Sequence, residues 1–302
     1  MTVHQLHVDH ARLYEQNRFV YPVLSRRSRG LSIGVNLNPD KICNFDCIYC
    51  QVDRTRQSET RFVDLQGLLA ELDGMLDLAV SGALFDTAKF RDAPQGLRRL
   101  NDIAFSGDGE PTTYKNFDEI IAACAAVKRK YDGGPLPAAP SALPGTHAGI
   151  KMVLITNASM LHRPHVARGL ATLDANNGEV WAKLEAGTAE YFKLVDRTPI
   201  AFQQILENIT AAAQVRPLVI QALFMRVAGD PPPPAELAAF CDRLREITTA
   251  GGRLKLVQVY TVARQPAESF VAPLADAEVD AIAALVEART GLPTAAFYGA
   301  AD

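Results

Sequence analysis

The stretch that decides the fold runs from residue 31 to residue 50 and reads LSIGVNLNPDKICNFDCIYC. Its first seven residues, 31–37, are largely apolar and β-branched, which predicts a buried strand. A polar loop at 38–41 comes next, and Cys43, Cys47 and Cys50 follow at once. Thiolates are soft ligands that suit zinc or an iron–sulfur cluster. The stretch therefore predicts a strand that leads into a metal-binding loop.

The rest of the chain repeats the pattern of strand, polar turn and helix. Further strands are expected at residues 102–105, 151–156, 180–184, 218–225 and 254–260. Helices are expected at 64–80, with Asp64 as its N-cap, and near 117–130, 165–170, 199–214, 235–249 and 276–289. Parallel strands need helical crossovers, so this alternation predicts an α/β fold, a partial (β/α)6 TIM-like barrel in a single domain.

The expected domain organisation is simple. The barrel is assigned to residues 31–290, after an irregular or helical N-terminal lead-in at 1–30 and before a C-terminal tail at 291–302. Residues 132–149 are rich in Pro, Gly and Ala and have no period, which predicts a surface loop. The βα rhythm resumes unchanged after this loop, so it is not read as a domain boundary.

Bulk composition excludes some classes of protein. A net charge of −3 gives no global reason to expect nucleic acid as a partner, and 48% hydrophobic with 22% charged residues is ordinary for a soluble protein. No apolar run approaches the ~20 residues that span a bilayer. The N-terminus is polar and mixed in charge, unlike a secretory signal. We therefore expect a cytoplasmic protein with no membrane partner.

The count of possible ligands narrows the choice of metal. A structural zinc normally takes four protein ligands, and the cysteine loop supplies three. Cys124 and Cys241 fall in helical stretches, and His10 and His147 are distant in sequence. The missing ligand favours a cluster with one iron left open for a small molecule. The alternative is a zinc-knuckle RNA-binding module without redox chemistry.

A second motif, SGDGEPT at residues 106–112, directly follows the strand at 102–105. Glycines at the carboxyl end of a strand let backbone groups approach a ligand closely, and active sites of barrels lie at that end. Taken alone, the motif is better explained as an ordinary tight turn. About 60 residues after the cysteine loop, at the next strand end, it predicts a ligand-binding turn.

Together, the C-x3-C-x2-C spacing with Tyr49 before the last cysteine and the Asp108-Gly109-Glu110 turn resemble the radical S-adenosylmethionine (SAM) superfamily. The resemblance implies one [4Fe–4S] cluster on Cys43, Cys47 and Cys50, with SAM on the open iron. It also implies reductive cleavage of SAM to a 5′-deoxyadenosyl radical that abstracts hydrogen from a substrate. Over residues 19–289 the layout resembles a bacterial group of Fe–S oxidoreductases related to the wybutosine-synthesis enzymes.

The resemblance also assigns expected roles to individual residues. The aromatic ring of Tyr49 is expected near the adenine, and the acidic group and exposed backbone of the turn are expected to receive the methionyl ammonium. The polar ends of further strands are expected near SAM. The full set of cofactor-binding candidates is Tyr49, Gly107, Asp108, Gly109, Glu110, Thr156, Asn157, Lys183, Glu185 and Gln221.

Three of these candidates have a structural alternative. Lys183 and Glu185 lie two residues apart on a strand, so both point to one face. Buried charges need partners, and either SAM or an internal Lys–Glu pair would provide them. Gln221, like Tyr260 on the following strand, either lines the pocket or belongs to the core.

Five arginines flank the cysteine loop in sequence, three before it and two after it. Arg26, Arg27 and Arg29 precede the first strand, and Arg54 and Arg56 follow the last cysteine. Charge runs usually mark a solvated face. Alternatively they bind a phosphate, a carboxylate or the backbone of an RNA partner.

Departures from related families limit the chemistry. Wybutosine-forming enzymes carry extra N-terminal cysteines for a second cluster, and this chain has none before Cys43. The resemblance then implies a single cluster, reduced by an external one-electron donor of the flavodoxin or ferredoxin type. A SAM-binding scaffold without radical chemistry is a third hypothesis, which the intact cysteine triplet disfavours. The motifs specify the superfamily and leave open whether the substrate is a small molecule, an RNA base or a protein.

Overall fold

The computed structural model describes residues 14–54, 58, 60–132, 149–266 and 268–299, and the chain forms two compact units. Unit 1 contains the described parts of residues 1–42, 57–154 and 164–179. Unit 2 contains those of residues 43–56, 155–163 and 180–302. Neither unit is continuous in sequence, so no point in the chain marks the start of a separate domain.

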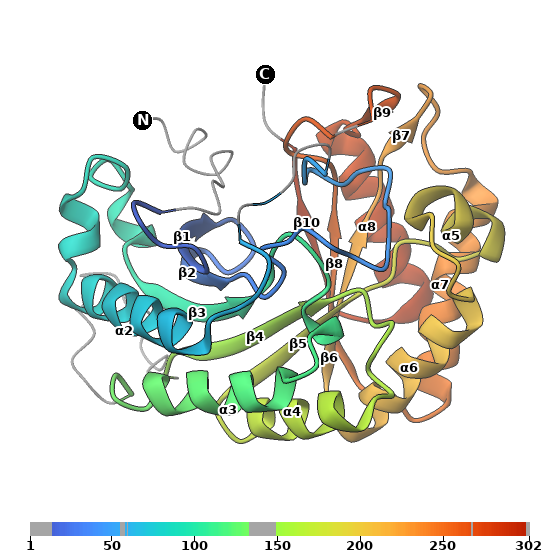
Figure 1. Cartoon of the computed structure of the whole chain (residues 1–302). Coiled ribbons are helices and arrows are strands. Elements are labelled where there is room, and N and C mark those ends of the chain that lie inside the picture. The colour runs from blue at the N-terminus through green and yellow to red at the C-terminus, as the bar shows by residue number, and fades with distance from the viewer. Residues whose placement is uncertain (1–13, 55–57, 59, 133–148, 267, 300–302) are drawn as a thin grey trace. The chain divides into compact units, whose positions relative to one another are not determined.

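Unit 1 is built on strands β1 (Val20–Ser25), β2 (Gly30–Val35), β3 (Leu100–Phe105) and β4 (Lys151–Thr156). β1 pairs with β2 in antiparallel fashion, whereas β2, β3 and β4 run parallel. Its helices are α2 (Leu65–Ser81), α3 (Phe117–Lys128) and α4 (Pro164–Asp174), with 3-10 turns η1 (Ala83–Asp86), η2 (Gln95–Leu97) and η3 (Pro111–Thr113). α3 packs against both α2 and α4 (Figure 1).

The start of α2 confirms a prediction made from the sequence. Asp64 is the N-cap, and its carboxylate accepts a hydrogen bond from the backbone N–H of Gln66 at 3.2 Å. An N-cap acceptor of this kind satisfies one of the N–H groups that a helix leaves unpaired at its start. Gly82 ends the helix with φ at 83°, in the left-handed region that glycine adopts readily.

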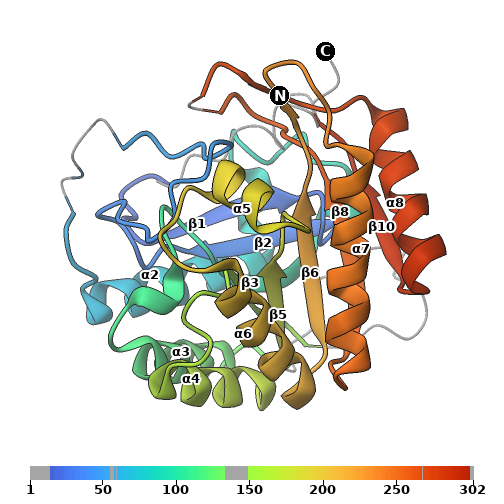
Figure 2. The same ribbon diagram turned by 90° about the vertical axis from the view of Figure 1, so that its right-hand side faces the viewer.

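Unit 2 is built on parallel strands β5 (Gly178–Lys183), β6 (Leu218–Leu223), β8 (Leu254–Tyr260) and β10 (Thr294–Phe297). A small antiparallel ribbon joins β7 (Arg226–Val227) to β9 (Val271–Ala272). The helices are α5 (Ala189–Asp196), α6 (Phe202–Val215), α7 (Pro234–Thr249) and α8 (Asp276–Thr290). Figure 2 shows α7 and α8 side by side next to the strands of this unit.

The order of the strands defines the fold class. The eight-stranded sheet runs β1-β2-β3-β4-β5-β6-β8-β10, so each new strand is added beside the one before it. A doubly wound sheet would instead reverse its order at a switch point. Strands added in one direction and joined by helices are the arrangement of a barrel. The predicted class, an α/β fold with a partial (β/α)6 TIM-like barrel, is confirmed.

Two strands lie outside the range that the sequence assigns to the barrel. The lead-in at 1–30 includes strand β1, and the tail at 291–302 includes strand β10. β1 contains Pro22, which lacks an N–H and argues against a central strand, but β1 lies at the edge of the sheet. β10 has four residues, too few to show a period, and it forms by pairing with β8. Of the predicted loop at 132–149, residues 133–148 lie outside the described residues.

The helices pack through faces of buried apolar residues. α6, for example, buries Phe202, Ile205 and Ile209 at helical spacing. Within the part of the chain that the structure describes, every helix is either too short or too polar to cross a membrane.

Asp102 on β3 should make stability depend on pH. Its side chain is buried and accepts a hydrogen bond from Ser32 of β2; burial raises its pKa from 3.8 to about 6, against the lowering effect of that bond. The folded protein binds this proton more tightly than the unfolded chain does. The resulting stabilisation is complete below pH 3.8 and is lost as the pH rises through about 6.

We expect Asp102→Asn to remove this loss, which amounts to about 3 kcal/mol for a shift of this size. Urea unfolding of both proteins between pH 4 and pH 7 measures it, because contributions that they share cancel at each pH. The variant should gain on the parent as the pH rises through this window. Parallel stability curves would show that Asp102 ionises normally in the folded state.

Candidate functional site

The cysteine loop of unit 2 is fixed by backbone bonds to the end of α5. The N–H of Ile48 donates to the carbonyl of Val195 at 2.9 Å, and that of Asp46 donates to the carbonyl of Asp196 at 3.2 Å. Ile48 is fully buried, and the ring of Phe45 packs edge-on against Phe192. The loop therefore has a defined conformation before any metal is considered.

The donor set of this loop fits an iron–sulfur cluster. Cys43, Cys47 and Cys50 are partly buried and are not joined in disulfides, and a turn brings the N–H of Cys50 to 2.9 Å from the carbonyl of Cys47. Cys124 and Cys241 are buried in α3 and α7, as the sequence predicted. Three thiols on one short loop suit a cluster with one open iron better than a four-ligand zinc site.

Asp196 is a residue that the sequence reasoning missed. Its buried carboxyl group accepts a hydrogen bond from Cys47 Sγ at 3.3 Å. Burial, followed by the negative charge of Glu185, raises the pKa of Asp196 well above its usual range. Burial, followed by Asp196 and Glu185, also raises the pKa of Cys47. Asp196 ends helix α5, where an acidic residue is unfavourable, and this was the available signal.

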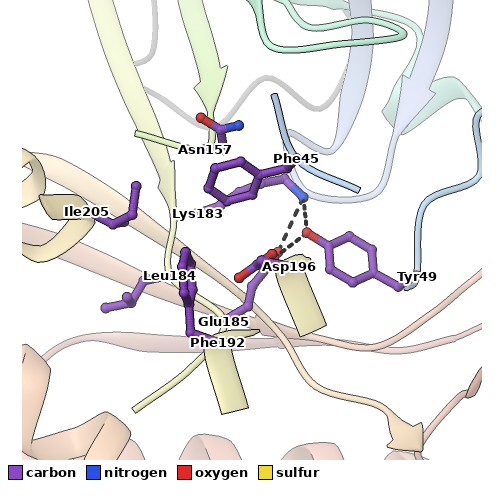
Figure 3. Close-up of a pocket in the computed structure, with 9 residues that line it drawn as sticks. All are labelled: Phe45, Tyr49, Asn157, Lys183, Leu184, Glu185, Phe192, Asp196 and Ile205. Atoms are coloured by element: carbon purple, nitrogen blue, oxygen red, sulfur yellow. Dashed lines mark hydrogen bonds and ion pairs between the residues drawn. The ribbon is translucent and has the colours of Figure 1, made fainter. Parts of the chain in front are cut away.

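Tyr49, Lys183 and Glu185 form a closed network in the same unit (Figure 3). The ammonium of Lys183 donates to the Tyr49 hydroxyl at 2.9 Å and to Glu185 Oε1 at 3.2 Å, and it lies 4.7 Å from the centre of the Tyr49 ring. The Tyr49 hydroxyl in turn donates to Glu185 Oε2. The internal Lys–Glu pair is therefore present, and each charged group has a protein partner.

Electrostatics hold this network in one protonation state. Burial lowers the pKa of Lys183 more than any single neighbour raises it, but the charges of Glu185, Tyr260, Cys47 and Asp196 together outweigh burial, so the net shift is upward. Burial, followed by the charges of Cys47 and Glu185, raises the pKa of Tyr49. Lys183 thus remains an ammonium and Tyr49 a neutral phenol near pH 7.

A small cavity borders the network and is drawn in Figure 3. It has room for about one water molecule, far too little for SAM. It is therefore a small gap in the interior of unit 2 and not by itself a cofactor pocket. Its walls are Phe45, Tyr49, Asn157, Lys183, Leu184, Glu185, Phe192, Asp196 and Ile205.

Thr156 and Asn157, predicted near SAM, also have partners in the protein. Thr156 Oγ1 accepts from the N–H of Ala158 at 3.0 Å, and Asn157 donates to the side chain of Asn44 at 2.9 Å. Asn44 lies between Cys43 and Cys47 and donates to Ser159 Oγ at 2.7 Å. Asn157, directly after β4, thus helps to position the cysteine loop.

The glycine-rich turn lies in unit 1 and leaves no room for side chains at two positions. A Cβ on Gly107 would clash with Asn36, and a Cβ on Gly109 would clash with the side chain of Asn38 and the carbonyl oxygen of Ile42. Ile42 is the residue directly before Cys43. The turn is therefore packed closely against the backbone of Ile42 within unit 1.

The acidic groups of the turn are already engaged. Glu110 is buried, and its Oε1 accepts from the N–H of Thr112 at 3.1 Å, so it caps the turn η3. The carboxylate of Asp108 accepts a hydrogen bond from Asn36 Nδ2 at 2.7 Å, and the backbone N–H of Asp108 donates to Asn36 Oδ1 at 3.1 Å. The carboxylate of Glu110 therefore shapes the turn.

Asn38 is a second residue that the sequence reasoning missed. Its side chain is buried beside Gly109, and its Nδ2 donates to Thr113 Oγ1 at 3.3 Å. Its Oδ1 has no hydrogen-bond partner among the described residues. A buried acceptor without a partner costs about 1–3 kcal/mol, so it is a candidate to receive a ligand donor. The polar NPDK loop was visible in the sequence, but the burial of this amide was not.

Gln221 lies in a polar row across unit 2. Lys183 of β5, Gln221 of β6 and Gln258 of β8 are register partners, so their side chains share one face. Gln221 is fully buried and donates to Gln258 Oε1 at 2.9 Å. Its own Oε1 has no partner among the described residues. One step along the same face, Tyr260 packs with Tyr49 and Leu223.

We expect the double variant Gln221→Met/Gln258→Met to unfold at a higher urea concentration than the parent. Its free energy of unfolding should be about 1 kcal/mol larger. Replacing both partners removes the unsatisfied acceptor together with its bond. Gln258→Met alone is the control and should destabilise, because it leaves both ends of Gln221 unpaired. A double variant less stable than this single one would mean that Gln221 Oε1 already has a partner.

The five predicted arginines fall into separate places. Arg26, Arg27 and Arg29 form the turn between β1 and β2 in unit 1, where Arg29 adopts φ of 54° and donates its N–H to the carbonyl of Ser25. Arg54 is in unit 2 and donates to Cys50 Sγ at 3.1 Å. Arg56 lies outside the described residues.

Comparison with known proteins identifies the family of the chain. A family model for the radical SAM superfamily matches residues 37–228. The chain therefore belongs to the radical SAM superfamily, as its motifs predicted. Membership implies SAM binding and an iron–sulfur cluster.

Among individual relatives, a UPF0026 protein of Helicobacter pylori strain J99 is 26% identical over 76% of this chain and 62% of its own length. A protein named GTPase Obg from Brachyspira hyodysenteriae is 27% identical over 58% of this chain and 20% of its own. The chain thus spans less than two thirds of these relatives.

Among solved structures, Streptococcus suis SuiB bound to SAM superposes with a TM-score of 0.56 at 13% identity, covering 90% of this chain and 52% of SuiB. At this level of identity the likeness supports the fold alone.

Proposed function

We propose that the chain holds one [4Fe–4S] cluster on Cys43, Cys47 and Cys50 and cleaves SAM reductively, to abstract hydrogen from a substrate not yet identified. The observation that carries the proposal is the fixed loop with three thiols outside any disulfide, tied to α5 and to the end of β4. When bound and reduced, such a cluster supplies the electron that breaks a carbon–sulfur bond of SAM. Hydrogen bonds to its sulfurs tune how readily it accepts that electron.

The residues around SAM are proposed from the turn in unit 1. The Glu110 carboxylate is used by its own turn, so the backbone of residues 107–109 and the free Oδ1 of Asn38 are the proposed acceptors for the methionyl ammonium. Gly109 supports this assignment because it packs against the residue before Cys43. In this proposal Asn38 takes the role that the resemblance implied for Glu110.

The network in unit 2 is proposed to form a rigid wall for the nucleoside part of SAM. Lys183 and Glu185 neutralise each other, and together they fix the Tyr49 hydroxyl. Tyr49 lies between two of the cysteines in sequence, so fixing its ring also fixes the loop. Three further residues remain proposed near SAM: Thr156, Asn157 and Gln221. They act on SAM indirectly, through the cysteine loop or through the polar row of Lys183, Gln221 and Gln258.

The partners follow from the chemistry. The cluster requires an external low-potential one-electron donor, proposed to be of the flavodoxin or ferredoxin type. RNA contact through Arg26, Arg27 and Arg29 remains a proposal that salt-dependent binding would test. A cytoplasmic location is likewise proposed, since oxygen-sensitive clusters suit a reducing compartment.

Anaerobic reconstitution with iron and sulfide, followed by SAM and dithionite, tests the function. We expect a brown protein that absorbs near 400 nm, contains about four iron atoms and forms 5′-deoxyadenosine and methionine. A protein with less than about one iron per chain, and with no cleavage of SAM, contradicts the proposal.

One observation favours a second candidate. The ligand atoms of Cys47, Glu185 and Asp196 all lie within 4.8 Å of one another, a donor set that zinc accepts. This reading corresponds to the zinc-binding alternative predicted from the sequence, with different ligands. A colourless protein with one zinc atom per chain, retained after Cys43→Ala, would support it.

A further inference from the structure

The side chain of Arg54 contacts one of the three cysteines of the proposed cluster site. It lies four residues after the last cysteine, and its Nη1 donates to Cys50 Sγ at 3.1 Å. The guanidinium is exposed whereas Cys50 is partly buried, so the contact joins the sulfur to the surface of unit 2. Cys47, by comparison, meets the carboxyl group of Asp196.

The segment between Cys50 and Arg54 is held in place. The side chain of Gln51 donates from Nε2 to the backbone carbonyl of Arg264 at 3.1 Å. Arg264 lies in the loop between β8 and β9 of the same unit. Arg54 therefore extends from an anchored segment and not from a free end.

A guanidinium beside a cluster sulfur has a defined electrostatic effect. Arginine stays protonated in proteins, so its charge is fixed and it only donates. Reduction adds one negative charge to the cluster, and a charge-assisted hydrogen bond stabilises the more negative state. Asp196 has no such fixed positive charge. The two cysteine contacts are thus unequal, and only that of Arg54 favours the reduced form by its charge.

We propose that Arg54 is a positioning residue that raises the reduction potential of the cluster through its bond to Cys50. This inference rests on the cluster proposed above. In the step concerned, a low-potential donor such as dithionite or a flavodoxin loses one electron and the cluster gains it. No covalent bond forms or breaks, and no proton moves.

The test is a potentiometric titration of the reconstituted protein, followed by electron paramagnetic resonance of the reduced cluster. For Arg54→Gln we expect the equilibrium constant for reduction to fall threefold to tenfold. That is a midpoint about 30–59 mV more negative, at 59 mV per tenfold for one electron. Arg54→Lys keeps the charge and should lie between Arg54→Gln and the parent. Arg245→Gln, which removes an exposed arginine of α7, should leave the midpoint unchanged.

The outcomes separate this inference from the function on which it rests. An Arg54→Gln protein with full iron content and the parent midpoint overturns the role of Arg54 and leaves the enzyme assignment intact. A parent that binds no cluster overturns the proposed function instead. If Arg54→Gln loses iron, Arg54→Met decides, because it also removes the charge and keeps a long side chain; an unchanged midpoint there would equally overturn the role. High salt should shrink the difference between parent and variant, because the guanidinium is exposed.

Discussion

Cys43→Ala is expected to abolish the cluster, lowering iron from about four atoms per chain to less than one after anaerobic reconstitution. The loop supplies three thiols, and a cubane with one iron already open cannot lose a second ligand and remain bound. Absorbance near 400 nm and formation of 5′-deoxyadenosine should disappear with the iron. The fold should persist, since Cys43 is only partly buried and the loop is anchored through Ile48 and Phe45.

Cys241→Ala is the matched control because it removes a cysteine thiol that lies buried in α7, away from the loop. It should keep its iron and its activity and lose about 1 kcal/mol or less of stability, the cost of a small cavity. A Cys43→Ala protein with undiminished iron would show that the loop is not the ligand set. The alternative ligand set would then be Cys47, Glu185 and Asp196.

Gly109→Ala should weaken SAM binding at least tenfold and lower stability by about 1–3 kcal/mol, the usual cost of overpacking. The new Cβ would meet the side chain of Asn38 and the carbonyl oxygen of Ile42, and a backbone carbonyl cannot rotate away as a flexible side chain can. Its displacement would shift the residue that directly precedes Cys43. Equilibrium dialysis of the reconstituted protein with labelled SAM measures the first effect, and thermal unfolding measures the second.

Gly74→Ala is the control for this change. Gly74 lies on the exposed face of α2, and a Cβ there would meet no atom within 4 Å. It should raise stability by about 0.5–1 kcal/mol through helix propensity and leave SAM binding unchanged. If Gly109→Ala behaved in the same way, the close approach at the turn would have no functional consequence.

Much of the fold could be predicted because its signals are local. Asp64 caps α2 through a bond to a residue two positions away, and the central strands are runs of neighbouring apolar residues. β1 and β10 escaped because neither has a local signal of sufficient strength. Pro22 in β1 argues against a central strand, and β10 has only four residues. Pairing with β2 and with β8 is what makes them strands.

The same distinction between local and long-range signals applies to the candidate site. The sequence by itself determined the three cysteines and their spacing, the glycines of the turn, and the placing of Lys183 and Glu185 on one face of a strand. These properties depend on residue type and on the period of the backbone. They required no knowledge of distant contacts.

Only the tertiary structure decided which groups meet. It gave the Glu110 carboxylate to its own turn, left the Asn38 Oδ1 without a partner among the described residues, and brought Asp196 to Cys47 across nearly 150 residues of chain. It also closed Lys183, Glu185 and Tyr49 into one network. The physical reason is that burial removes water as a partner, so a polar group must find one elsewhere in the chain. Which partner it finds depends on long-range packing, which no local pattern records.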